Sequence, residues 1–82
     1  MRLLVREVAM KQGLNLSQLH AAINRTTARS TAMVTLRRYW YATKDGKEQG
    51  PPIELVDLVL LNAIARILGV ELINLINTAE LD

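Results

Sequence analysis

The chain has no cysteine and no phenylalanine among its 82 residues. The absence of cysteine excludes a disulfide framework and a thiolate zinc site, and it favours a reducing compartment. Aromatic residues make up only 4% of the chain, whereas half of its residues are apolar. The core must therefore be built mainly from Leu, Ile, Val, Ala and Met, and this composition favours an all-α fold.

An apolar run long enough to span a membrane is also missing. Polar residues interrupt the longest apolar stretch, 53–68: Glu54, Asp57, Asn62 and Arg66. Arg6 and Glu7 come too early in the chain for a signal peptide. A chain of this length forms one domain with one core, residues 1–82. We expect a soluble, cytoplasmic protein associated with the nucleoid and not with a membrane.

Patterns for catalysis and metal binding are absent from the sequence. There is no pair of carboxylates, no serine-histidine arrangement and no glycine-rich phosphate loop, so we do not expect an enzyme. His20 is the single histidine and has no carboxylate four residues away, so a metal site is not expected. We predict no cofactor, no metal and no small-molecule effector.

Charge is distributed unevenly along the chain, although the net charge is only +2. Residues 1–47 carry nine basic and two acidic residues, a net charge of +7. Residues 48–82 carry one basic and six acidic residues, a net charge of −5. A basic half on a compact domain attracts polyanions such as DNA, although a charged face can also serve only to solvate a surface.

Apolar spacing and capping residues predict five helices. The first is expected over 2–12, ending at Gly13, and the second begins after an N-cap at Asn15 or Ser17. The third is expected over 31–41, after a polar connection. Its packing face is predicted to contain Met33, Leu36 and Trp40, with Thr31, Thr35 and Arg38 on another face.

The aromatic residues Tyr39, Trp40 and Tyr41 end this third helix. They could stack on bases, but three consecutive helical residues cannot all face the same way. Packing in the core is therefore favoured for them.

The segment 42–56 is expected to form a long loop, with a short hairpin or wing as the alternative, because Asp45-Gly46 and Gly50-Pro51-Pro52 break helices. Asp57 can cap a fourth helix that ends at Gly69, and Glu71 can begin a fifth. The predicted core face of the fourth helix contains Leu58, Leu61, Ile64, Ala65 and Leu68.

The segment 58–75 contains the pattern Leu-x-x-Ile-Ala-x-x-Leu-Gly-Val, followed by a short leucine-rich helix. It resembles the last two helices of phage-repressor and Cro-type DNA-binding domains, the xenobiotic-response-element family. Upstream, Leu16-Ser-Gln-Leu and Thr35-Leu-Arg-Arg-Tyr-Trp look like the helix-turn-helix of this family. Two features depart from its pattern: Asn24 stands at the usual turn glycine, and the chain from Leu19 to Leu36 is several residues longer.

The resemblance implies a five-helix, repressor-like domain that binds double-stranded DNA and regulates transcription. Its second helix would cross the DNA backbone, and its third would enter the major groove. The candidates for base contacts are Arg29, Ser30, Thr31, Thr35 and Arg38. The candidates for phosphate contacts are Gln18, Arg25, Arg37, Lys44 and Lys47.

Residues 53–81 include 19 apolar residues out of 29, more than one face of two short helices can bury. We therefore predict a homodimer that presents two reading helices to a palindromic site. The candidate interface residues are Leu55, Val56, Val59, Leu60, Ile73 and Ile76.

Two other functions fit the sequence. The domain could be a protein-interaction or antitoxin-type helix-turn-helix module, with an incidental basic face. It could also be an architectural or excisionase-like protein that bends DNA without strong base reading.

Overall fold

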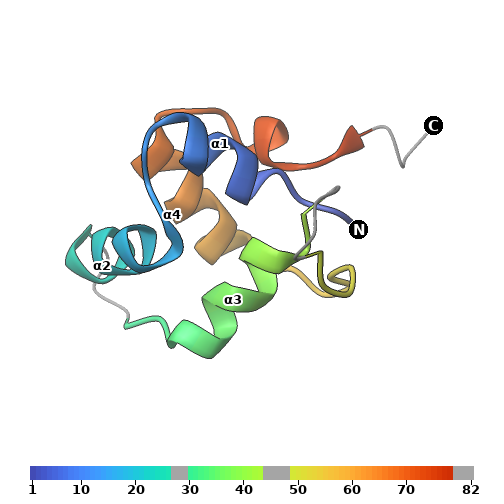
Figure 1. Ribbon diagram of the computed structural model, residues 1–82, viewed down its shortest axis with the longest axis horizontal. Coiled ribbons are helices and arrows are strands. Elements are labelled where there is room, and N and C mark those ends of the chain that lie inside the picture. The colour runs from blue at the N-terminus through green and yellow to red at the C-terminus, as the bar shows by residue number, and fades with distance from the viewer. Residues whose placement is uncertain (27–29, 44–48, 79–82) are drawn as a thin grey trace.

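The computed structural model describes residues 1–26, 30–43 and 49–78. These ranges contain four α-helices, a short 3₁₀ helix and no strand, which confirms the all-α class (Figure 1). The elements are α1 (Val5–Lys11), α2 (Leu16–Thr26), α3 (Met33–Tyr41), α4 (Leu58–Leu68) and the 3₁₀ helix η1 (Leu72–Leu75). None of the helices in these ranges has the length and hydropathy needed to cross a membrane.

Helix α4 is the element around which the others pack. It contacts α1, α2 and η1, while α3 packs against α1 and α2. The core lies between these helices and is aliphatic apart from Tyr39 and Trp40. Its largest fully buried apolar side chains are Leu3, Val5, Leu19, Ile23, Leu36, Leu61, Ile64 and Leu75.

Both ends of α4 were correctly predicted from local signals. The Asp57 carboxylate accepts hydrogen bonds from the backbone N–H groups of Val59 at 2.9 Å and Leu60 at 3.3 Å. Gly69 ends the helix with a φ of +68°, a left-handed conformation that favours glycine. The capped N-terminus and the glycine at the C-terminus fix the length of this central helix.

The fifth predicted helix is only one 3₁₀ turn, η1. Its N-cap, Glu71, makes no side-chain cap hydrogen bond, and the C-cap at Ile76 is extended. The chain at this point pairs with the N-terminal segment instead of continuing a helix, because Leu3 and Ile76 form an antiparallel bridge. The predicted five-helix arrangement is therefore four α-helices and one short turn within the described residues.

The N-terminal segment lies between two segments that are distant in sequence. The Leu3 N–H donates to the Ala42 carbonyl and the Leu4 N–H to the Leu75 carbonyl, both at 2.7 Å. The Asn77 N–H donates to the Arg2 carbonyl at 3.0 Å. These bonds hold residues 2–4 outside the helix, so α1 begins at Val5 and not at residue 2 as predicted.

The segment between α3 and α4 is a loop whose described parts contain no hairpin strands. The Gly50 N–H donates to the Tyr41 carbonyl at 2.7 Å, which closes the base of the loop. The Ile53 side chain is buried, and its N–H donates to the Met1 carbonyl at 2.9 Å. The predicted wing falls largely on 44–48, outside the described residues.

Candidate nucleic-acid interface

Asn24 and His20, on α2, hold the chain just before α3. The Thr31 N–H donates to Oδ1 of Asn24 at 2.8 Å. The His20 ring nitrogen Nε2 lies 2.7 Å from the Thr31 carbonyl oxygen and donates to it, because a carbonyl can only accept. Side chains of α2 therefore hold both backbone polar groups of Thr31.

The solvent-exposed face of α3 is continuous over two turns. Leu36, Tyr39 and Trp40 are buried and form the opposite face. The outer face consists of residues three and four positions apart, which are neighbours on a helix surface. They are Val34, Arg37, Arg38 and Tyr41, of which Tyr41 is half-buried and the others are exposed.

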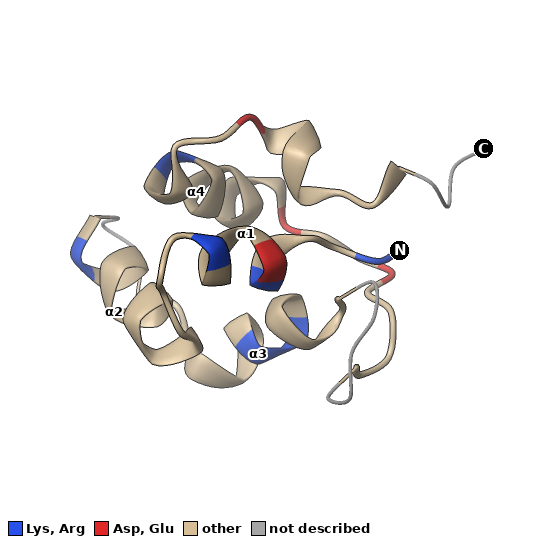
Figure 2. Cartoon of the chain, turned by 45° about the horizontal axis from the view of Figure 1, so that its top comes forward, with Lys and Arg blue, Asp and Glu red and all other residues tan. Residues whose placement is uncertain are grey.

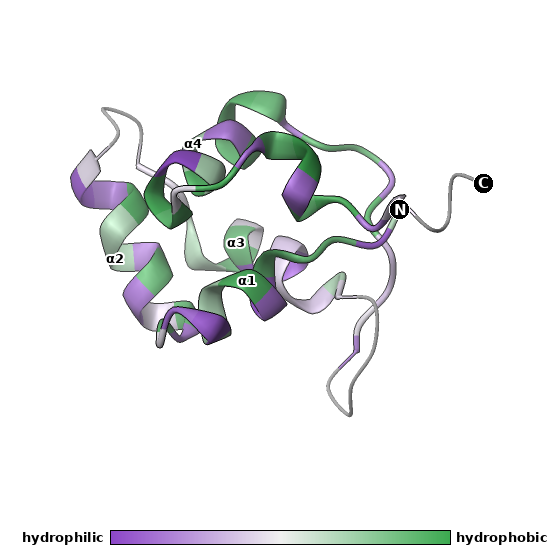
Figure 3. Cartoon of the chain, turned by 90° about the horizontal axis from the view of Figure 1, so that it is seen from above, coloured by the Kyte–Doolittle hydropathy of each residue, from purple (hydrophilic) through white to green (hydrophobic). Residues whose placement is uncertain are grey.

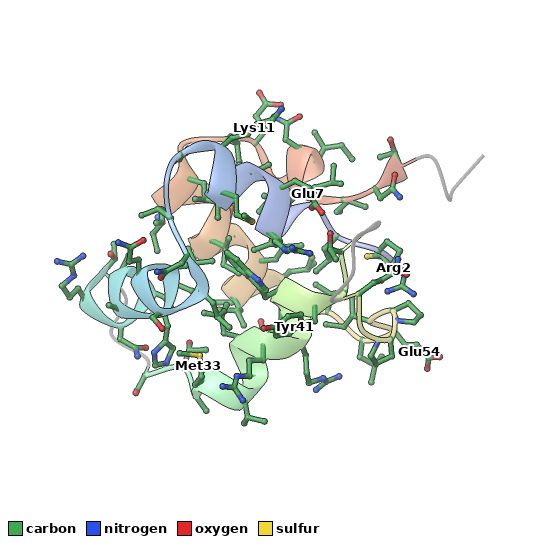
Figure 4. The ribbon with its side chains drawn as sticks, viewed as in Figure 1. Arg2, Glu7, Lys11, Met33, Tyr41 and Glu54 are labelled. Carbon is green, nitrogen blue, oxygen red and sulfur yellow. The ribbon has the colours of Figure 1, made fainter. Side chains whose placement is uncertain are left out.

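This outer face borders a groove of about 290 Å³. One wall is the outer face of α3, and the other is the turn Pro51, Pro52 and Ile53. In Figure 4, Tyr41 lies near the C-terminal end of α3, and Glu54 points outward from the turn, away from the helix. None of the described residues that line the groove is acidic.

A second hollow, of about 600 Å³, adjoins the N-terminus of α2. Arg6, Gln18 and Trp40 are among its lining residues. Gln18 is part of a reciprocal capping box: its N–H donates to Oδ1 of Asn15 at 2.8 Å, and its Oε1 accepts from the Asn15 N–H at 2.9 Å. The carboxamide nitrogen of Gln18 takes no part in this pair of bonds.

The described basic residues are concentrated on α1, α2 and α3. Figure 2 shows acidic residues on α1 and in the connections on either side of α4, but none on α2 or α3. The acidic residue of α1, Glu7, accepts a hydrogen bond from the Thr43 hydroxyl, and its Oε2 is buried. The guanidinium groups of Arg37 and Arg38 form no hydrogen bond or ion pair with the described residues.

The predicted base-contact residues occupy different environments. Arg38 lies on the outer face of α3, and Ser30 is exposed in the connection before it. Thr31 and Thr35 are half-buried, at the edge of the helix or before it. Arg29 lies outside the described residues.

The predicted phosphate-contact residues are exposed where they are described. Gln18 lies at the start of α2 and Arg25 at its end, while Arg37 lies beside Arg38 on α3. Lys44 and Lys47 lie outside the described residues.

Sequence reasoning missed Val34 and Tyr41 as members of the outer face. It assigned Met33, Leu36 and Trp40 to the packing face, but Tyr39 is also buried and its hydroxyl accepts a hydrogen bond from the Asp57 N–H at 2.8 Å. Because Tyr39 is buried, the buried face of α3 lies closer to Thr35 than predicted, and Val34 is left exposed. The periodicity 34, 37, 38 and 41 was the signal that could have revealed this.

The predicted dimer residues divide into exposed and packed side chains. Leu55, Val59 and Ile73 are 84%, 65% and 54% exposed. Val56 and Ile76 are half-buried against the core.

Leu60 was assigned to the dimer surface, but it is buried in the core of the protomer. Leu58 was assigned to the core, but it is 63% exposed. Leu58 is the first residue of α4, and side chains of a helix point towards its N-terminus, so Leu58 projects beyond the elements that cover the helix. Figure 3 shows the hydrophobic residues of α4 and η1 along one side of the molecule.

His20, the only histidine, is bonded to the backbone of Thr31, as described above. Within the described ranges, no group of three potential metal-ligating side chains is found.

Comparison with protein-family models, curated proteins and solved structures finds no match to this chain.

Proposed function

We propose that the protein binds double-stranded DNA sequence-specifically through the outer face of α3 and regulates transcription. The observation that carries this proposal is the exposed pair of arginines Arg37 and Arg38, whose guanidinium groups form no hydrogen bond or ion pair with the described residues and lie on a helix without acidic residues. The resemblance of segments 16–19 and 58–75 to Cro-type domains supports the same function.

The dimensions and chemistry of α3 suit the major groove of DNA. This groove is wide enough for an α-helix, and an arginine can donate two hydrogen bonds to the acceptor pair of guanine. The N-terminus of α2, with Gln18 and Arg6 nearby, is suited to a phosphate of the DNA backbone. Phosphate contacts would set the register in which α3 meets the base pairs.

The proposal is tested by selecting bound duplexes from a random pool at low and high salt. We expect enrichment of a defined motif, because base contacts discriminate between sequences. Binding that depends on salt but enriches no motif would favour the architectural alternative. An absence of binding would contradict the proposal and favour a protein-interaction module.

The selected duplex then allows the two arginines to be tested separately. We expect Arg37→Ala or Arg38→Ala to weaken binding by roughly 1 to 3 kcal/mol where the side chain reads a base. Arg66→Ala is the matched control, because it removes one exposed positive charge from α4. If Arg66→Ala weakened binding to the selected duplex as much as the other two variants do, the binding would depend on net charge and not on α3.

We further propose that the protein forms a homodimer through the exposed apolar residues at the start of α4. Leu55, Leu58 and Val59 lie close together in sequence and are all more than half exposed. Leu58 replaces Leu60 in the interface predicted from sequence. Isolated surface hydrophobic residues are common, but such a cluster on a small domain is typical of an interaction surface.

Sedimentation equilibrium of the wild type and of Val59→Lys tests this interface. We expect a dimer for the wild type and a monomer for the variant, with the helical content unchanged because Val59 is exposed. A wild type that stays monomeric at high concentration would contradict the dimer.

A further inference from the structure

The groove beside α3 is partly built by the connection that leads to α4. Pro51 and Pro52 line it together with Val34 of α3. Val34 is 70% exposed, so the packing of the core does not account for an apolar residue at this position. The exposed residues Val34, Pro51 and Pro52 give the groove an apolar strip beside Arg37 and Arg38.

The proline wall is held in place from both sides. On one side, the Gly50 N–H donates to the Tyr41 carbonyl on α3, and the Arg2 guanidinium donates to the Gly50 carbonyl. On the other side, Ile53 is buried and bonded to the Met1 carbonyl. Because proline fixes its own φ, the groove keeps its shape without a ligand.

The lining of the groove restricts the chemistry of its ligand. Arg37 and Arg38 also line the groove, and the described part of its lining contains no carboxylate. A complementary ligand therefore combines negative charge with an apolar edge. In the major groove of DNA, the 5-methyl group of thymine is the apolar group that a base pair presents.

We infer that this groove receives the methyl edge of a thymine, with Val34 as a specificity-determining residue and the proline turn as the second wall. This inference rests on the proposed DNA binding and goes beyond it, because base reading is then shared between α3 and the α3–α4 connection. The volume of about 290 Å³ is several times the ~30 Å³ of a water molecule in the liquid, so the groove has room for the edge of a base.

The test uses the duplex selected for the wild-type protein, with each thymine replaced in turn by uracil. This replacement removes one methyl group and leaves every hydrogen-bonding group of the base in place. At one position we expect uracil to weaken wild-type binding by about fourfold, as for the loss of one buried methylene group. At the other positions, uracil should have little effect.

Val34→Ala identifies the residue that contacts this methyl group. The variant should bind the thymine duplex more weakly than the wild type does, and it should no longer distinguish thymine from uracil at the sensitive position. The double variant with Pro51→Ala and Pro52→Ala alters the other wall of the groove. It should reduce the same discrimination between thymine and uracil. Val34 is exposed, so Val34→Ala should keep the thermal stability of the wild type.

If uracil weakened the binding of Val34→Ala as much as it weakens the binding of the wild type at every position, the methyl group and Val34 would act independently. That result would overturn this inference while leaving DNA binding intact. The same holds if uracil has no effect at any position. Failure to select any motif would overturn the proposed function, and the inference with it.

Discussion

Asn24 on α2 accepts a hydrogen bond from the backbone N–H of Thr31, across the connection to α3. The two residues are seven positions apart, and the bond length is 2.8 Å. This contact fixes where α3 begins relative to α2. It therefore helps to set how the outer face of α3 is oriented relative to α2.

We expect Asn24→Ala to destabilise the fold by about 1 kcal/mol relative to Asn62→Ala, because it removes this hydrogen bond. Asn62 is an exposed residue of α4, so its substitution controls for the higher helix propensity of alanine. Urea unfolding of the two variants measures the difference. Equal stabilities would show that the contact with Thr31 does not hold the connection.

Leu58 and Leu60 at the start of α4, one exposed and one buried, give a second prediction. We expect Leu60→Ala to lower the free energy of unfolding by about 2 to 4 kcal/mol, since it leaves a cavity in the core. Leu58→Ala should change it by less than about 0.5 kcal/mol when measured on the monomer. Both variants replace a leucine by alanine on the same helix. A larger loss of stability in Leu58→Ala than in Leu60→Ala would therefore contradict the burial described above.

The buried Thr43 hydroxyl donates to Glu7, and this bond gives a third prediction. Thr43→Val keeps the shape of the side chain but removes the donor, which leaves a part-buried carboxylate with one fewer partner. We expect a loss of about 1.5 to 3 kcal/mol in thermal or urea unfolding. Thr43→Ser keeps the hydroxyl and should be the more stable of the two variants, whereas equal stabilities would argue against the bond.

Gly50 gives a fourth prediction, because a Cβ atom there would lie 3.1 Å from the Tyr41 Cβ and 3.3 Å from its carbonyl oxygen. Gly50→Ala should push the proline turn away from α3 and speed hydrogen exchange of the position-50 amide. Gly69→Ala is the control: it strains a positive φ but meets no atom within 4 Å. It should lower global stability and leave the position-50 amide hydrogen-bonded. Unchanged exchange in Gly50→Ala would contradict the close approach.

Local sequence signals were sufficient for the helices whose ends are set by capping residues. Asp57 and Gly69 gave both ends of α4, and Asn15 gave the start of α2. The all-α class followed from composition and periodicity. These features depend on interactions within a few residues, which a single sequence displays directly.

The errors arose where distant segments determine the structure. Residues 2–4 were predicted as helix, but their backbone groups bond to 42, 75 and 77. Tyr39 is buried, and its hydroxyl accepts a hydrogen bond from the distant Asp57 N–H, so the exposed face of α3 differs from the predicted one. The groove beside Val34 depends on the loop returning to Tyr41, a contact that local periodicity does not reveal.

The position of the N-terminal segment between 42–43 and 75–77 also has a consequence for synthesis on the ribosome. Residues 1–4 are synthesised before both sets of their partners, and 75–77 are synthesised much later than 42–43. Until then, Leu3 and Leu4 lack part of their backbone pairing, and the core beneath them stays open to water. We therefore expect the nascent chain to remain only partly folded until residues 75–77 have emerged from the ribosome.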